Sequence, residues 1–264
     1  MSVVNINSCN YYYEIHGSGD DILVFSHGLL WRGSVFEKQI EYFKSKYSIL
    51  IYDQCGHGQS EILEKDFKSR CLFKDTIKLL DLLGFEQVHF IGLSMGADLA
   101  IRIALKRPDL IKSLVLISAS ITPESNYNRY SLLNNVLRFS GIKTILQPVL
   151  VNMFSIQFLN DPDNKEEIKK WTEELLNNKK EIHFAISAAL KRENIDMEML
   201  QNITCQTLIL AGTEDKAIPP ENSEFLHLKI KNSTLSFIEG CGHMICIEDP
   251  KMCNHEIETF LDQL

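Results

Sequence analysis

The nine residues 88–96, which read V-H-F-I-G-L-S-M-G, limit the possible folds of this chain more than any other stretch. Four residues that favour β structure lead into G-L-S-M-G, and apolar residues at helical spacing follow. This pattern predicts a buried strand that turns sharply into a helix, with Ser94 at the apex. Such a turn brings backbone segments close together, so it needs residues without a Cβ at Gly92 and Gly96.

Ser94 in this turn is a candidate nucleophile. The strained turn would hold its hydroxyl out for attack, and the N–H of Met95 would have no partner within the new helix. Because a helix N-terminus favours negative charge, this N–H could stabilise an oxyanion. The alternative is that the two glycines only shape a strand-helix connection and that the serine is a small polar filler.

Length and composition favour one globular domain that carries an insertion. The chain has 264 residues, of which 45% are hydrophobic and 23% charged, and this is enough for a large core. The formal net charge of −8 argues against nucleic acid and anionic membranes as partners. No apolar run is long enough to predict a membrane span, and the first residues do not resemble a secretion signal.

The chain contains seven cysteines, an odd number without the spacing of a small disulfide scaffold. We therefore expect reduced thiols and a cytoplasmic location. A cluster near the end of the chain could instead be written as a zinc site: Cys241, His243, Cys246, Cys253 and His255. Its intervals differ from the paired spacing that a compact tetrahedral zinc site uses, so we predict buried thiols and neither a metal nor another cofactor.

Short apolar runs alternate with helical patterns along most of the chain. The alternation predicts an α/β fold with a doubly wound, mostly parallel sheet and helices on both faces. An antiparallel hairpin is expected over residues 2–15, and a helix over 71–83 that ends at Gly84. The predicted strands that follow the hairpin cover residues 22–25, 48–53, 88–94, 114–117, 207–211 and 234–238.

This alternation stops in the middle of the chain, where helix-length amphipathic segments follow one another without a convincing strand. We predict an inserted helical lid at 121–202 and a core domain made of residues 1–120 and 203–264. One apolar helix is expected over 142–156. Its apolar stripe faces an apolar substrate or packs the lid onto the core, and packing is the favoured interpretation.

A serine hydroxyl is a weak nucleophile and needs a base, which a third group must orient. The loops after the last two predicted strands supply candidates at the same edge of the sheet as Ser94. His243, between turn residues, is the predicted base. Asp215 is the predicted acid because its short side chain would hold an imidazole more rigidly than Glu214 or Glu239. The structural alternatives are a loop histidine with local hydrogen bonds and a helix-capping aspartate.

Five motifs, in this order, resemble the α/β-hydrolase fold family across essentially the whole chain. They are S-H-G-L-L at 26–30, Y-D-Q-C-G-H-G-Q-S at 52–60, G-L-S-M-G at 92–96, A-G-T-E-D at 211–215 and G-C-G-H at 240–243. The resemblance implies a catalytic triad in the order Ser94, Asp215, His243 and a lid built by the insertion. It also implies an oxyanion hole formed by the backbone N–H groups of Leu29 and Met95.

Other side chains near these motifs receive minor roles. We expect His27 to shape the loop that carries Leu29, which we call the oxyanion loop. His57 is expected to belong to a structural turn. Trp31 and Met244 are predicted to line the substrate pocket, with packing in the core as the alternative. Asp98 differs from the small or apolar residue often found in the family's helix after the nucleophile. We expect it to make a buried polar contact, and we have no functional account of it.

Together these residues predict a serine hydrolase that cleaves a small, partly apolar carboxylic ester or lactone through an acyl-serine intermediate. The same triad is compatible with thioester hydrolysis, carbon-carbon bond hydrolysis and peracid formation. A ligand receptor that keeps the triad and signals through lid movement is an alternative of another class. A zinc-dependent hydrolase that uses the cluster from Cys241 to His255 is a third.

Overall fold

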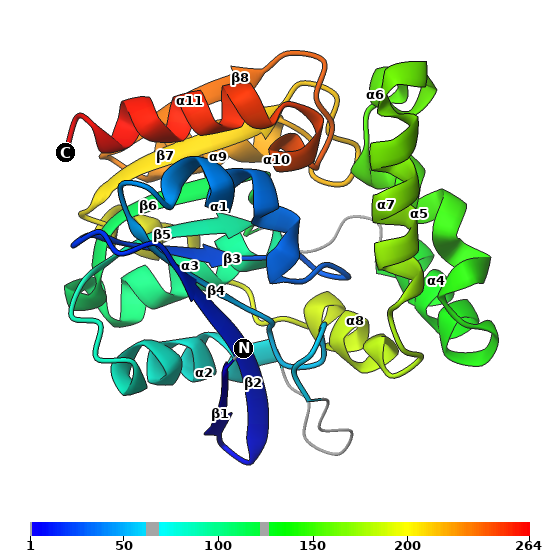
Figure 1. The fold of residues 1–264 in the computed structure, drawn as a ribbon, viewed down its shortest axis with the longest axis horizontal. Helices are drawn as coiled ribbons and strands as arrows, with labels where there is room; N and C mark the ends of the chain where they lie inside the picture. The colour runs from blue at the N-terminus through cyan, green and yellow to red at the C-terminus, as the bar shows by residue number, and fades with distance from the viewer. Residues whose placement is uncertain (1, 62–68, 122–126) are drawn as a thin grey trace.

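An eight-stranded sheet forms the centre of the molecule (Figure 1). The structure is a computed structural model and describes residues 2–61, 69–121 and 127–264. The strands lie in the order β1-β2-β4-β3-β5-β6-β7-β8. Their bounds are β1 (Ser2–Ile6), β2 (Cys9–His16), β3 (Ile22–Ser26), β4 (Ser48–Tyr52), β5 (Val88–Leu93), β6 (Ile111–Ile117), β7 (Gln206–Gly212) and β8 (Ser233–Ile238).

The six neighbouring strands from β4 to β8 in the sheet are parallel, whereas β1 and β2 form an antiparallel edge. The predictions of a mostly parallel sheet and of an N-terminal hairpin are confirmed. The hairpin turns at Asn7 and Ser8, whose φ angles are 52° and 67°. Positive φ at both turn residues matches the twist of a two-residue hairpin, and asparagine tolerates it well.

Helices cover both faces of the sheet, as a doubly wound fold requires. One face carries α1 (Glu37–Phe43), α10 (Ile245–Glu248) and α11 (Pro250–Leu261), and the other carries α2 (Ser69–Leu82), α3 (Met95–Lys106) and α9 (Glu221–Lys229). Successive strand residues point to opposite faces, so Val24 packs with the second group and Phe25 with the first. Burial on both faces explains why these strands read as continuous apolar runs.

Between β6 and β7 the described part of the chain is helical. It forms α4 (Tyr127–Ser140), α5 (Leu146–Met153), α6 (Ile156–Asn160), α7 (Lys165–Leu176) and α8 (Ile182–Leu190). Figure 1 shows α4 to α7, in green, grouped beyond the carboxyl ends of the parallel strands and apart from the helices that cover the sheet. They occupy the segment for which a lid is predicted, and their function as a lid stays a prediction.

The expectation of a single helix over 142–156 is wrong. The chain forms a 3-10 turn at Ile142–Ile145, then α5, and becomes extended at Ser155 before α6 begins. The backbone N–H of Ser155 donates to the carboxylate of Glu248 at 2.9 Å, and its hydroxyl accepts the N–H of Phe158 at 3.1 Å. Because a distant carboxylate takes this N–H, the helical hydrogen-bond pattern stops here.

One apolar cluster joins the sheet to the inserted helices. Phe25 and Ile51 of the sheet share it with Val149 of α5 and Trp171 of α7. This continuity supports the favoured interpretation, in which the apolar stripe of the insertion packs it onto the core. None of the helices in the described ranges combines the length and the apolar character that a bilayer span requires.

Candidate active site

Ser94 lies at the junction between β5 and α3. Its φ of 55° is in the left-handed region, which is uncommon for a residue with a Cβ. A Cβ on Gly92 would come within 2.4 Å of the carbonyl of Gly96, and a Cβ on Gly96 within 2.0 Å of the carbonyl oxygen of Ser26. Since no side chain fits at these distances, the geometry requires both glycines. The turn therefore holds Ser94 in a strained conformation at the carboxyl end of the sheet.

The loop after β3 lies against this turn. A Cβ added to Gly28 would be 3.4 Å from the Cβ of Ser94. Leu29 follows in the same loop, and Met95 is the first residue of α3, where the N–H groups have no partner within the helix. Leu29, Ser94 and Met95 all line the same cavity, and the role of Leu29 and Met95 as an oxyanion hole stays a prediction.

The last two strands bring an aspartate and a histidine together. Nδ1 of His243 lies 2.8 Å from Oδ2 of Asp215, and the two side chains are only 3% and 1% exposed. Oδ1 of Asp215 accepts the backbone N–H groups of Ala217 and Ile218, at 2.9 Å and 2.8 Å. A carboxylate fixed in this way keeps the imidazole proton on Nδ1 and leaves Nε2 as an acceptor. The alternative acids are both exposed: Glu214 and Glu239.

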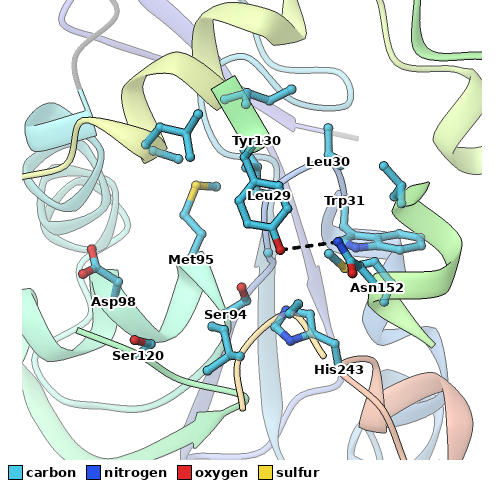
Figure 2. Close-up of a pocket in the computed structure, with 18 of the residues that line it drawn as sticks. Leu29, Leu30, Trp31, Ser94, Met95, Asp98, Ser120, Tyr130, Asn152 and His243 are labelled. Carbon is cyan, nitrogen blue, oxygen red and sulfur yellow. Dashed lines mark hydrogen bonds between the residues drawn. The ribbon is translucent and has the colours of Figure 1, made fainter. Parts of the chain in front are cut away.

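Ser94 and His243 line one cavity of about 190 Å³ between the sheet and the inserted helices. Figure 2 shows the serine beside the imidazole at the wall of this cavity, with Tyr130 and Asn152 of the insertion facing them. The amide of Asn152 donates to the hydroxyl of Tyr130 at 3.4 Å. Most of the remaining wall is apolar and includes Leu29, Leu30, Trp31, Met95, Leu99, Ile145, Val149, Met153 and Ile186.

The two residues predicted to line the pocket differ in their positions. Trp31 lines the cavity, and its side chain also packs edge-to-face against Trp171 with ring centroids 5.8 Å apart, so both interpretations hold for it. Met244 is fully buried in the apolar core and lies outside the described lining of the cavity. The prediction of a pocket role for Met244 is therefore corrected: only its neighbour His243 reaches the cavity.

His27, in the loop after β3, and His57 are buried structural groups. Nδ1 of His27 donates to the carbonyl of Gly28 at 2.8 Å, and its Nε2 accepts the N–H of Gln54 at 2.9 Å. His57 uses Nδ1 to donate to the carbonyl of Cys55 at 3.2 Å. Burial lowers the pKa of His27 to about 4 and that of His57 to about 3. Both rings are neutral at neutral pH, which supports the structural interpretation.

Two side chains that the sequence analysis did not select hold the backbone around His243. The hydroxyl of Ser118 donates to the carbonyl of His243 at 2.9 Å. The carboxylate of Glu248 accepts the N–H of Gly242 at 3.1 Å, and burial raises the pKa of this carboxyl group. Ser118 could have been found because it follows a strand at the correct edge of the sheet. Nothing local in the sequence marks Glu248.

Three cysteines near the end of the chain are buried thiols, and burial raises the pKa of each: Cys241, Cys246 and Cys253. His255, from the same sequence cluster, is exposed, and His243 is bonded to Asp215. Among the residues that the structure describes, no three His, Cys, Asp or Glu side chains are grouped so that they could hold a metal ion. The geometry therefore gives no support to the zinc-dependent alternative.

Comparison with known proteins assigns the chain to a family. Residues 21–250 match the family described as alpha/beta hydrolase fold. The chain belongs to the α/β-hydrolase fold family. The fold and the family that the motifs predicted are confirmed, and with them an enzyme of the hydrolase class.

Relatives cover nearly the whole chain. The enzyme 3-oxoadipate enol-lactonase 2 of Acinetobacter baylyi is 28% identical over 250 residues, which are 94% of this chain and 92% of that protein. The enol-lactonase structure from Burkholderia xenovorans LB400 has a TM-score of 0.92 at 21% identity and covers 99% of this chain and 100% of its own. A thermophilic esterase from Thermogutta terrifontis, solved with malate bound, has a TM-score of 0.90 at 23% identity, covering 100% of this chain and 99% of its own. At such identities the two structures show the fold alone.

Proposed function

We propose that this α/β hydrolase cleaves a small, partly apolar carboxylic ester or lactone through an acyl-serine intermediate. The observation that carries the proposal is the buried contact of 2.8 Å between Asp215 and His243 at a cavity that also contains the strained Ser94. An ester or lactone is favoured because one of the relatives that are 28% identical over almost the full chain is named an enol-lactonase; others at this identity are named putative carbamate hydrolases. The cavity of about 190 Å³ suits a small substrate, and its mainly apolar wall suits a partly apolar one.

In the acylation step, Oγ of Ser94 attacks the carbonyl carbon of the substrate while Nε2 of His243 takes its proton. The negative charge moves to the carbonyl oxygen, where the N–H groups of Leu29 and Met95 stabilise it. The carboxylate of Asp215 stabilises the imidazolium. When the tetrahedral intermediate collapses, the bond to the leaving oxygen breaks, and this oxygen receives the proton from His243.

In the deacylation step, water attacks the acyl-serine carbonyl with His243 again as the base. Collapse of the second intermediate releases the carboxylic acid and returns the proton to Ser94. For a lactone the leaving alcohol stays tethered to the acyl group, so acylation opens the ring and deacylation releases a single hydroxy acid. Both steps place the negative charge on the same carbonyl oxygen, so the same pair of N–H donors serves acylation and deacylation.

The test compares Ser94→Ala with the wild type on p-nitrophenyl esters and small lactones. We expect kcat to fall on the order of 10⁴-fold or more, because removing the nucleophile removes the covalent route. A fluorophosphonate should label the wild type at Ser94, as read by mass spectrometry of the peptide. Ser140→Ala, at an exposed serine of α4, is the matched control and should keep full activity and labelling. Full activity of Ser94→Ala would refute the proposal, and a single slow turnover by the wild type would favour the receptor alternative.

A further inference from the structure

A side chain from the insertion bonds directly to the backbone of the oxyanion loop. The amide of Asn178 donates to the carbonyl of Leu30 at 2.9 Å and to the carbonyl of Leu175 at 3.0 Å. Leu175 belongs to the last turn of α7, so the amide joins the end of an inserted helix to the loop after β3. The two residues of this contact are 148 positions apart in the chain.

Leu30 has a backbone conformation that needs such support. Its φ is 74°, a left-handed value that a type II turn requires at its third residue and that glycine usually supplies. Within the turn, the N–H of Trp31 donates to the carbonyl of Gly28 over a long distance of 3.3 Å. A left-handed leucine persists only where the surrounding structure holds it in place. The Asn178 amide provides this hold because it binds the carbonyl of the strained residue itself.

The same helix is fixed to the same loop at two further points. The guanidinium of Arg32 forms an ion pair with Glu174, and these side chains are 35% and 14% exposed. Trp31 packs edge-to-face on Trp171 with ring centroids 5.8 Å apart. Residues 30–32 are therefore held against α7 by contacts of three kinds. Among them, the hydrogen bond from Asn178 acts directly on the turn that contains Leu29.

We propose that Asn178 is a positioning residue that holds the Leu29 N–H in the oxyanion hole. This inference rests on the proposed function, because it assigns to Leu29 a role in stabilising the oxyanion. If the bond to Leu30 is lost, the strained residue can relax to an ordinary φ, and the turn from Gly28 to Trp31, which carries the Leu29 N–H, changes its shape. The donor is then misplaced relative to Ser94, although the nucleophile, base and acid are unchanged.

The experiment uses Asn178→Ala, which removes the amide, and Asn178→Asp, which keeps its size but replaces the donor with an acceptor. Asn177→Ala is the matched control, since Asn177 is the exposed neighbour of the same residue type. Each variant is measured for kcat and KM on a p-nitrophenyl ester. Each is also measured for inhibition by an aryl trifluoromethyl ketone, which forms an anionic adduct with the serine and so reports on the oxyanion hole.

For both Asn178 variants we expect kcat to fall about 10- to 100-fold, as for a misplaced catalytic group, with KM within about twofold of the wild type. The inhibition constant of the ketone should rise by the same factor, because the ketone adduct and the transition state use the same donor. Asn177→Ala should match the wild type in all three values.

Two outcomes would overturn the inference. The first is that Asn178→Asp keeps both kcat and the inhibition constant within about twofold of the wild type. This variant decides the matter because its side chain has the size of asparagine and disturbs folding less than alanine does. The second is a change confined to KM, which would indicate that Asn178 acts only on the shape of the insertion. Either result leaves the proposed function intact, whereas that function fails independently if Ser94→Ala keeps its activity.

Discussion

Asp215 makes two kinds of contact with one carboxylate. Oδ2 binds the imidazole of His243, while Oδ1 accepts the N–H groups of Ala217 and Ile218. The sequence presented a catalytic acid and a helix-capping aspartate as alternatives for this residue, and in the structure one carboxylate contacts both the imidazole and two backbone N–H groups. The cap fixes the carboxylate, so Oδ2 keeps its position relative to the histidine.

Asp215→Asn separates these two contacts. The asparagine keeps an oxygen for the two backbone N–H groups, but its NH₂ faces Nδ1 of His243 and favours the wrong tautomer. We expect kcat to fall about 10⁴-fold with little change in the urea midpoint of unfolding. Glu214→Gln, at the exposed neighbouring acid, should keep wild-type kcat. If Glu214→Gln lost activity and Asp215→Asn did not, the catalytic acid would be Glu214 and the assignment to Asp215 would be wrong.

At the level of elements, Asp98 joins α3 to the chain after α8. Its carboxylate lies 2.7 Å and 3.2 Å from two nitrogens of Arg102, and the guanidinium of Arg192 lies farther away, at 3.7 Å. Arg102 also donates to the backbone carbonyl of Glu193. The expected buried polar contact of Asp98 is thus an ion pair within α3 that also holds the end of the insertion. The charge of Asp98 has a structural explanation that sequence analysis alone did not provide.

Asp98→Ala should destabilise the fold strongly. The side chains of Asp98 and Arg102 are only 8% and 14% exposed, so the variant leaves a largely buried guanidinium without its carboxylate. We expect a loss of about 3–5 kcal/mol in the free energy of unfolding, measured in urea. Glu41→Ala is the control, because its pair with Lys44 is exposed and should contribute less than about 1 kcal/mol. Equal losses for the two variants would contradict the buried-pair interpretation.

For the whole molecule, the buried histidines couple stability to pH. The pKa of His27 is lowered to about 4 and that of His57 to about 3, whereas an unfolded chain has a histidine pKa of about 6.5. Below pH 6.5 the unfolded state therefore binds protons that the folded state does not. Stability is fully present above this pH and decreases as the pH falls toward the folded pKa values. Each such histidine contributes a slope of up to about 1.4 kcal/mol per pH unit.

The urea midpoint of the wild type should accordingly decrease between pH 6.5 and pH 5. His57→Gln should show a shallower decrease, because one of the protons bound on unfolding is removed. His255→Gln, at an exposed histidine, should keep the slope of the wild type. At lower pH an opposite effect sets in, because burial raises the pKa of Asp53 and of Glu248, and protonation of such groups favours the folded state. A midpoint that is constant over this window would contradict the assignment of buried, neutral rings.

Much of the fold and part of the candidate site could be predicted from the sequence, because the rules concerned act over a few residues. Apolar runs identified the strands, and the two glycines around Ser94 indicated a turn in which no Cβ fits. The order of strand ends then placed Asp215 and His243 at the same edge as the serine.

Only the tertiary structure decided which contacts hold these parts in place relative to one another. The break at Ser155 depends on Glu248, 93 positions away, and the carbonyl of His243 is held by Ser118, 125 positions away. The burial of Met244 likewise depends on which elements pack around it. Local sequence determines backbone conformation through steric and hydrogen-bonding preferences within a few residues. Which distant polar group satisfies a given N–H or carbonyl is set only when the chain has folded and water has been excluded.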